Sequence, residues 1–127
     1  MNQNAKKWIA TLRSGEFKQG KAVLLRDNKY CCLGVACELF IRDGGQLAKA
    51  IVADAFGETT TFHGMTAELP PEVVSWLGLT RRDGYFYTPE FESLTRLNDR
   101  GLVFEAIADI IESEPKGLFR EQPQATT

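Results

Sequence analysis

Apolar side chains recur at helical spacing in several segments of the chain. The two clearest sets are Ala5, Trp8, Ile9 and Leu12, and Phe104, Ile107, Ala108 and Ile111. Residues three and four apart lie on one face of a helix, so both segments predict amphipathic helices. A wider apolar stripe starts at Cys32 and indicates the most buried helix. Shorter helices are predicted over residues 71–77 and 93–97.

Short segments between these helices favour strands. Residues 21–26 and 29–31 flank Asp27-Asn28, a pair that tolerates positive φ and predicts a two-residue hairpin turn. Residues 50–53 fit either a strand or the end of a helix. Strands are also favoured by the β-branched and aromatic residues of two further segments, 59–62 and 85–87.

The predicted fold class is α+β. We expect a single compact domain over residues 1–114, with four or five helices and two or three short antiparallel hairpin strands. Residues 115–127 are polar and contain two prolines, so we expect a C-terminal tail with no role in the core.

Composition is that of an ordinary globular domain, with 127 residues, 43% hydrophobic and 25% charged. This excludes a disordered chain and a disulfide-scaffold toxin. No apolar run reaches the roughly 18 residues of a membrane span, and the polar start lacks the apolar region of a secretory signal. We therefore expect no membrane partner. Three cysteines, an odd number, suit a reducing compartment, so we expect the cytoplasm.

Charge is unevenly distributed along the chain. Residues 1–30 carry seven basic and two acidic side chains, whereas the remaining 97 residues carry eight and fifteen. The basic end indicates an anion-facing surface, or alternatively a solvated helix face. Within it, the glycine-flanked loop 15–20 could hold a small anion through backbone amides and lysines. The predicted ligand-binding residues are Arg13, Lys18, Gln19 and Lys21, with Asn98 and Asp99 at a helix–helix corner.

The cysteines allow three interpretations. Cys31, Cys32 and Cys37 could bind zinc with His63, but adjacent cysteines do not have the ligand spacing of structural zinc sites. A cysteine-dependent enzyme would use Cys31 or Cys32 near a helix N-terminus, with His63 as the base. Buried core thiols are the simplest alternative. We expect no metal, no cofactor and no catalytic residues, so the sequence favours a non-catalytic role.

One segment is similar to half of a helix-turn-helix. Residues 97–101 form a glycine-containing turn before the helix that starts at Phe104. A complete motif needs a basic recognition helix next, and prolines and a glycine interrupt the chain there. A nucleic-acid-binding protein with a truncated motif therefore remains an alternative, and nucleic acid is the less favoured partner.

Several motifs in one order resemble a group of small, largely uncharacterised proteins of phages, prophages and bacteria. They are Arg13-Ser-Gly with Gln19-Gly, Tyr30-Cys-Cys-Leu-Gly-Val-x-Cys, Leu69-Pro with Trp76-Leu-Gly-Leu, Leu97-Asn-Asp-x-Gly, and Phe104-x-x-Ile-Ala-Asp-x-Ile-Glu. The resemblance covers roughly residues 8–112. The group often has a serine where this chain has Val103, so the usual cap of the last helix is lost or moved.

The resemblance implies a phage-type accessory protein in the cytoplasm of a bacterial host. Such a protein would bind a host protein or a small anionic, nucleotide-like ligand, with counter-defence as one role. It implies no catalytic residues and leaves the oligomeric state open.

Overall fold

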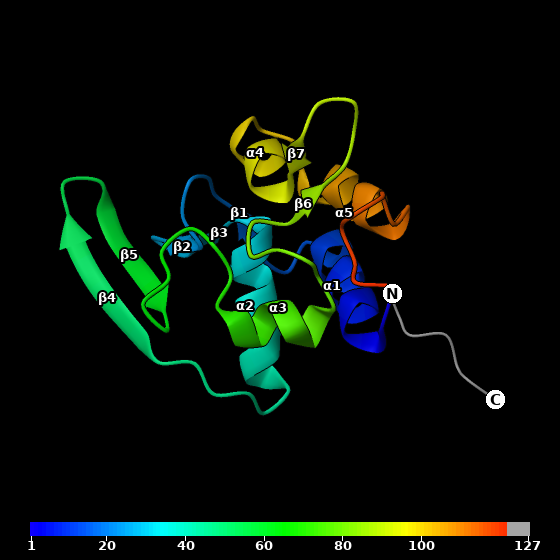
Figure 1. Cartoon of the computed structure of the whole chain (residues 1–127). Coiled ribbons are helices and arrows are strands. Elements are labelled where there is room, and N and C mark those ends of the chain that lie inside the picture. The colour runs from blue at the N-terminus through cyan, green and yellow to red at the C-terminus, as the bar shows by residue number, and fades with distance from the viewer. Residues whose placement is uncertain (122–127) are drawn as a thin grey trace.

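The computed structural model describes residues 1–121. Within them the helices are α1 (Gln3–Ser14), α2 (Cys32–Arg42), α3 (Pro71–Leu77), α4 (Leu94–Asp99) and α5 (Phe104–Glu112). The strands are β1 (Lys18–Gln19), β2 (Leu25–Arg26), β3 (Lys29–Tyr30), β4 (Lys49–Asp54), β5 (Gly57–Phe62), β6 (Tyr85–Phe86) and β7 (Glu92–Ser93). The predicted α+β class and its helices are confirmed (Figure 1).

The strands form two sheets. The larger has the order β1-β3-β2-β5-β4, in which only the β1–β3 pair is parallel, and β6 pairs with β7 in a small antiparallel sheet. More strands form than the sequence predicts. Residues 49–54 adopt the strand alternative, while β1 and β7 have two residues each, too few to leave a periodic pattern.

Local signals in the sequence place the turns and helix ends. Asp27 and Asn28 have φ of 49° and 65°, as a two-residue turn between β2 and β3 requires. The Asn2 side chain accepts a hydrogen bond from the Ala5 N–H at 2.8 Å and starts α1. Ser93 does the same for the Arg96 N–H and starts α4.

Helix α2 lies at the centre of the core, in contact with α1, α3 and α4. Its first turns are fully enclosed, and the buried Trp8 indole donates to the Cys32 carbonyl at 2.9 Å. A Cβ at Gly34 would lie 1.9 Å from the Leu24 carbonyl oxygen, so only glycine allows the chain before β2 to pass this closely.

The C-terminal prediction needs a correction over residues 115–121. Leu118 is fully buried, Phe119 forms a β-bridge with Leu79, and the Arg120 N–H donates to the Gly78 carbonyl at 2.8 Å. Two apolar residues between charged and polar neighbours were enough to anchor this segment, although its composition is that of a tail. The rest of the predicted tail, residues 122–127, lies outside the described part.

The hairpin of β4 and β5 projects from the helical body (Figure 1). All six residues of β4 are exposed, whereas β5 buries Thr59, Thr60 and Phe62. The large sheet therefore ends on one side in a strand with an open edge.

Candidate functional site

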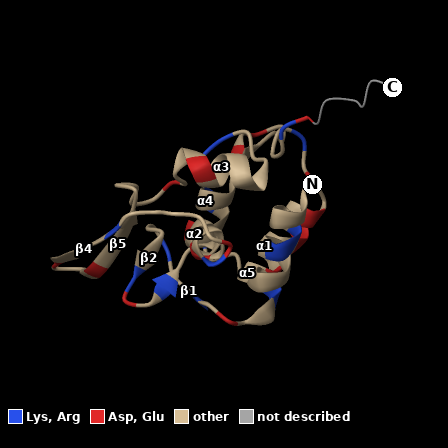
Figure 2. Ribbon diagram, turned by 90° about the horizontal axis from the view of Figure 1, so that it is seen from below, with Lys and Arg blue, Asp and Glu red and all other residues tan. Residues whose placement is uncertain are grey.

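The predicted basic surface is partly neutralised within the fold. Arg13 on α1 donates to Asp109 at 2.7 Å and to Glu112 at 3.0 Å, both on α5. The hydrogen bond from Arg13 lowers the pKa of Glu112, and these contacts raise the pKa of Arg13. Figure 2 shows basic segments of α1 beside acidic ones of α5. Arg13 therefore joins the first helix to the last.

Gln19 and Asn98 meet in a hydrogen-bonded cluster. Asn98 is fully buried, and its Oδ1 accepts from the Cys32 N–H at 3.1 Å and the Gln19 Nε2 at 3.0 Å. Its Nδ2 donates to the Gly20 carbonyl at 2.8 Å. These bonds hold the segment around β1 against the start of α2 and the end of α4. Both polar atoms of the Asn98 side chain therefore form hydrogen bonds within the protein.

Gln19 also replaces the missing cap of α5. Val103 occupies the cap position and makes no side-chain bond, but the Phe104 N–H donates to Gln19 Oε1 at 3.1 Å. The Gln19 amide returns a bond to the Leu102 carbonyl at 2.8 Å. The cap is therefore provided by a residue that lies 85 positions before Phe104 in the chain.

Of the remaining predicted ligand-binding residues, Asp99 lies next to this cluster. Asp99 accepts from the Ala22 N–H at 2.8 Å, which helps hold Ala22 at a φ of 72°. Lys18 and Lys21 are exposed. The structure thus brings Gln19, Asn98 and Asp99 together, and leaves Arg13 on the α1–α5 side.

The cysteines are parts of the core. Cys31 Sγ accepts from the Gly34 N–H at 3.4 Å and caps α2, and burial raises the pKa of the Cys31 thiol to about 11. Burial also raises the pKa values of Cys32 and Cys37. Among residues 1–121, no group of three or more His, Cys, Asp or Glu side chains is arranged to hold a metal ion.

His63 lies in a turn next to α3. Its Nδ1 is 3.0 Å from a carboxylate oxygen of Glu72, and its side chain is 43% exposed. Burial raises the pKa values of the three thiols, whereas an activated cysteine nucleophile has a lowered pKa.

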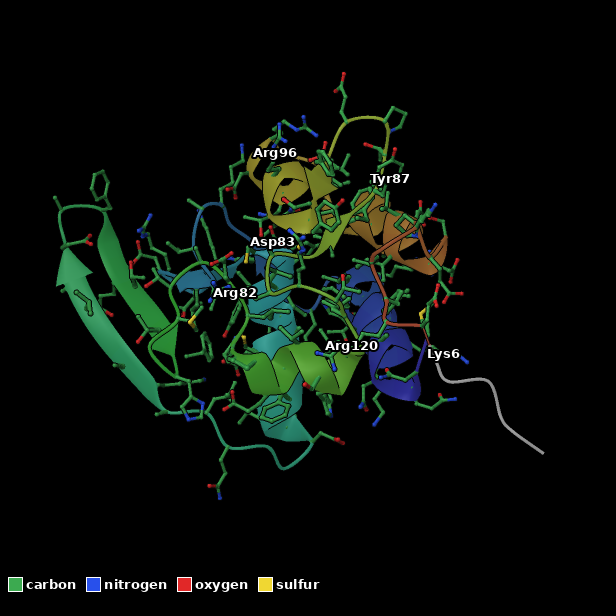
Figure 3. The ribbon with its side chains drawn as sticks, viewed as in Figure 1. Lys6, Arg82, Asp83, Tyr87, Arg96 and Arg120 are labelled. Carbon is green, nitrogen blue, oxygen red and sulfur yellow. The ribbon has the colours of Figure 1, made fainter. Side chains whose placement is uncertain are left out.

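A cleft next to α3 brings Arg120 together with the sequence neighbours Arg81 and Arg82. It has a volume of about 520 Å³. Its lining residues are Glu68, Pro71, Val74, Ser75, Thr80, Arg81, Arg82, Asp83 and Arg120. Arg81 and Arg82 follow α3, and the bridge between Leu79 and Phe119 brings Arg120 to the same cleft. Figure 3 shows Arg82 and Arg120 beside α3. We call this the arginine cleft.

The charges of the arginine cleft are only partly paired. Arg82 Nε lies 3.6 Å from a Glu68 oxygen, with both side chains well exposed, so this ion pair is weak. Arg120 forms no ion pair with any residue in the 1–121 range. With three arginines against Glu68 and Asp83, the lining keeps a net positive charge.

An aromatic strip, formed by Tyr85, Tyr87 and Phe91, starts beside Arg81 of the arginine cleft. Tyr85 stacks on Phe91 with ring centres 5.8 Å apart, and Tyr87 meets Phe91 edge-on at 6.1 Å. Tyr87 is 51% exposed and Phe91 67% exposed. The Arg81 guanidinium lies 4.5 Å from the centre of the Tyr85 ring, so Arg81 connects the cleft to the strip.

The sequence analysis did not find the arginine cleft because it compared charge only along the chain. Arg81 and Arg82 lie between the predicted helix at 71–77 and the predicted strand at 85–87, and Arg120 lies in the predicted tail. The sequence signal that could have indicated this cleft is the pair of adjacent arginines next to three closely spaced aromatic residues.

Comparison with known proteins gives a family match and no further relative. A family model described as a domain of unknown function (DUF8296) matches residues 1–115. No curated protein and no solved structure matches the chain. The matched range covers α1 to α5 and leaves Arg120 outside it. None of the helices within residues 1–121 has the length and apolar character to cross a membrane.

Proposed function

The chain belongs to the DUF8296 family, whose description assigns no activity, and we propose that it is a non-catalytic binding module for a small anionic, nucleotide-like ligand. The observation that carries this proposal is the arginine cleft with its aromatic border. Arginines recognise phosphate through charge-assisted, geometrically matched hydrogen bonds.

The two parts of the surface suit the two parts of a nucleotide. Arg82 and Arg120 offer guanidinium groups to a phosphate, and Ser75 adds an exposed hydroxyl. Phe91 presents an exposed ring on which a base can stack. A cavity of this volume also lies within the range of small-molecule sites.

The biological setting of the proposal comes from the resemblance to phage and prophage proteins. In that setting the ligand is a host nucleotide or signalling molecule, and its capture serves counter-defence in the bacterial cytoplasm. Three free, buried thiols suit a reducing compartment. Burial of the three cysteines also supports a non-catalytic role, because it leaves no activated thiol nucleophile among them.

Isothermal titration calorimetry with the four common ribonucleoside diphosphates tests the proposal. We expect at least one to bind, with the affinity falling about tenfold in Arg82→Ala and in Arg120→Ala, since a charge-assisted hydrogen bond contributes about 1.5–3 kcal/mol. Inorganic pyrophosphate should respond to the same variants. Phe91→Ala should weaken nucleoside diphosphate binding and leave pyrophosphate binding unchanged.

Lys18→Ala and Lys21→Ala are the matched controls, because they remove cations from the surface predicted from sequence. Their affinities should equal that of the unchanged protein. Binding lost in these controls but kept in the arginine variants would place the site at the basic N-terminal segment instead. Absence of binding by every nucleotide tested would refute the proposal. A single-stranded oligonucleotide that binds tightly where nucleotides do not would establish the nucleic-acid alternative.

A further inference from the structure

The open edge of β4 lacks the features that normally prevent edge strands from pairing. Ile51 is 66% exposed and Val52 53% exposed, and alanines flank them. Native edge strands are usually interrupted by a charge, a proline or a bulge. In β4 the charges stand only at the two ends, and the charge of Lys49 is held 2.5 Å from Glu38 on α2.

The hydrogen-bond pattern of the hairpin shows which groups face the open edge. The His63 N–H donates to the Ala48 carbonyl at 2.7 Å, and the register places Ala50 opposite Thr61 and Val52 opposite Thr59. Hydrogen-bonded pairs alternate along an antiparallel ladder. Residues 48, 50, 52 and 54 therefore bond towards β5, and the N–H and C=O groups of Lys49, Ile51 and Ala53 point outwards.

From this pattern we infer that β4 pairs with β4 of a second copy of the chain, antiparallel and about a two-fold axis at Ile51. A two-fold axis perpendicular to a sheet relates each residue to its own equivalent and keeps it on the same face. Directly opposed residues also share a face. The central residue of a symmetric pair therefore opposes itself, and the pair at the axis is hydrogen-bonded only if the backbone groups of that residue are free.

With the two-fold axis at Ile51, all the outward-facing N–H and C=O groups of β4 form hydrogen bonds to the second copy. This axis opposes Ile51 to its equivalent and Lys49 to Ala53 of the second copy, on both sides of the axis. Each hydrogen-bonded pair exchanges two bonds, so three pairs supply about six. With the axis at Val52 instead, the two residues opposed at the axis would exchange no hydrogen bonds, because the backbone groups of Val52 already bond to Thr59.

Side-chain chemistry in this register is compatible with a second copy. No like charges stand opposite each other, since Lys49 meets an alanine and Asp54 meets Ala48. Two β-branched Ile51 side chains oppose one another, which favours strand pairing. Figure 1 shows β4 on the outer side of the hairpin, away from the helical body, so the two bodies lie at opposite edges of the joined sheet.

Sedimentation velocity over a range of protein concentrations tests this inference. We expect a concentration-dependent dimer. Ile51→Lys places two lysines opposite each other and should raise the dimer dissociation constant at least tenfold. Val103→Lys is the matched control, because it makes a similar change at a β-branched residue that is 60% exposed and far from β4 in the sequence. It should leave the dimer unchanged.

Two further variants examine the backbone and the register. Ile51→Pro removes an N–H that faces the open edge and keeps the bonds to β5, so it should give a folded monomer. After mild oxidation, the introduced thiols of Ile51→Cys should cross-link two chains more completely than those of Val52→Cys, since only the former oppose each other. A monomer at every concentration, a dimer unaffected by Ile51→Lys, or assembly beyond a dimer would overturn the inference.

Discussion

Removal of the Asn98 side chain should destabilise the whole domain. In Asn98→Ala, the buried Cys32 N–H loses its partner, and so does the half-buried Gly20 carbonyl. A buried polar group without a partner costs about 1–3 kcal/mol. Because the Gly20 carbonyl is only half-buried, we count it at the lower end of that range. The expected loss in the free energy of unfolding is then about 2–4 kcal/mol. Because domains of this size are stable by about 5–15 kcal/mol, the loss is a large share of the total.

Urea denaturation followed by tryptophan fluorescence measures this loss. Trp8 is a suitable reporter because it is fully buried and donates to the Cys32 carbonyl, close to the site of the change. Asn4→Ala is the control. Asn4 donates to the Trp76 carbonyl at 2.9 Å, but that oxygen keeps a second donor in Asn2 at 3.0 Å. The control should lose less than about 1 kcal/mol.

A double-variant cycle separates the shared bond from the other contacts. Gln19→Ala also breaks the contact between Gln19 and Asn98, so the separate effects of the two substitutions should sum to more than their combined effect. An Asn98→Ala protein no less stable than Asn4→Ala would show that the cluster does not hold the fold together. Strict additivity of the two substitutions would show that their shared bond contributes nothing.

Two other predictions concern the backbone and the thiols. Ala22→Gly should raise the free energy of unfolding by about 0.5–1 kcal/mol, because the φ of 72° costs alanine about 1–2 kcal/mol and glycine returns part of that in chain entropy; a lower urea midpoint in the variant would contradict this. Cys31, Cys32 and Cys37 should react slowly with a thiol reagent at pH 8 in the native protein and rapidly in urea, because burial keeps them neutral. A thiol that reacts rapidly in the native state would favour the cysteine-dependent enzyme.

The predictable parts of the fold depend on neighbouring residues. Helical spacing and the turn at Asp27-Asn28 involve residues at most a few positions apart, and the structure confirms both. The C-terminal segment was missed because its burial depends on Leu118 and on the pairing of Phe119 with Leu79. A single well-placed leucine is not visible in the composition of a polar segment.

The candidate site likewise combines features that local sequence explains with features that depend on distant residues. Tyr30-Cys-Cys-Leu-Gly is one of the motifs that carry the resemblance, and three of its residues have a structural explanation. Cys31 caps α2, Cys32 receives the Asn98 bond, and Gly34 admits the Leu24 backbone. By contrast, the arginine cleft joins residues about 40 positions apart through a β-bridge. Local patterns carry no information about such a pairing.

The contact between the first and last helices has a consequence for biosynthesis. Arg13 and Asp109 are 96 residues apart, and the bond from Phe104 to Gln19 spans 85. At about 5–20 residues per second, a ribosome needs about 5–20 s to make that intervening stretch. Throughout this time the face of α1 that α5 later covers has no partner. The domain therefore completes its fold only after its C-terminal helix has emerged, and until then the nascent chain presents an apolar surface to which chaperones can bind.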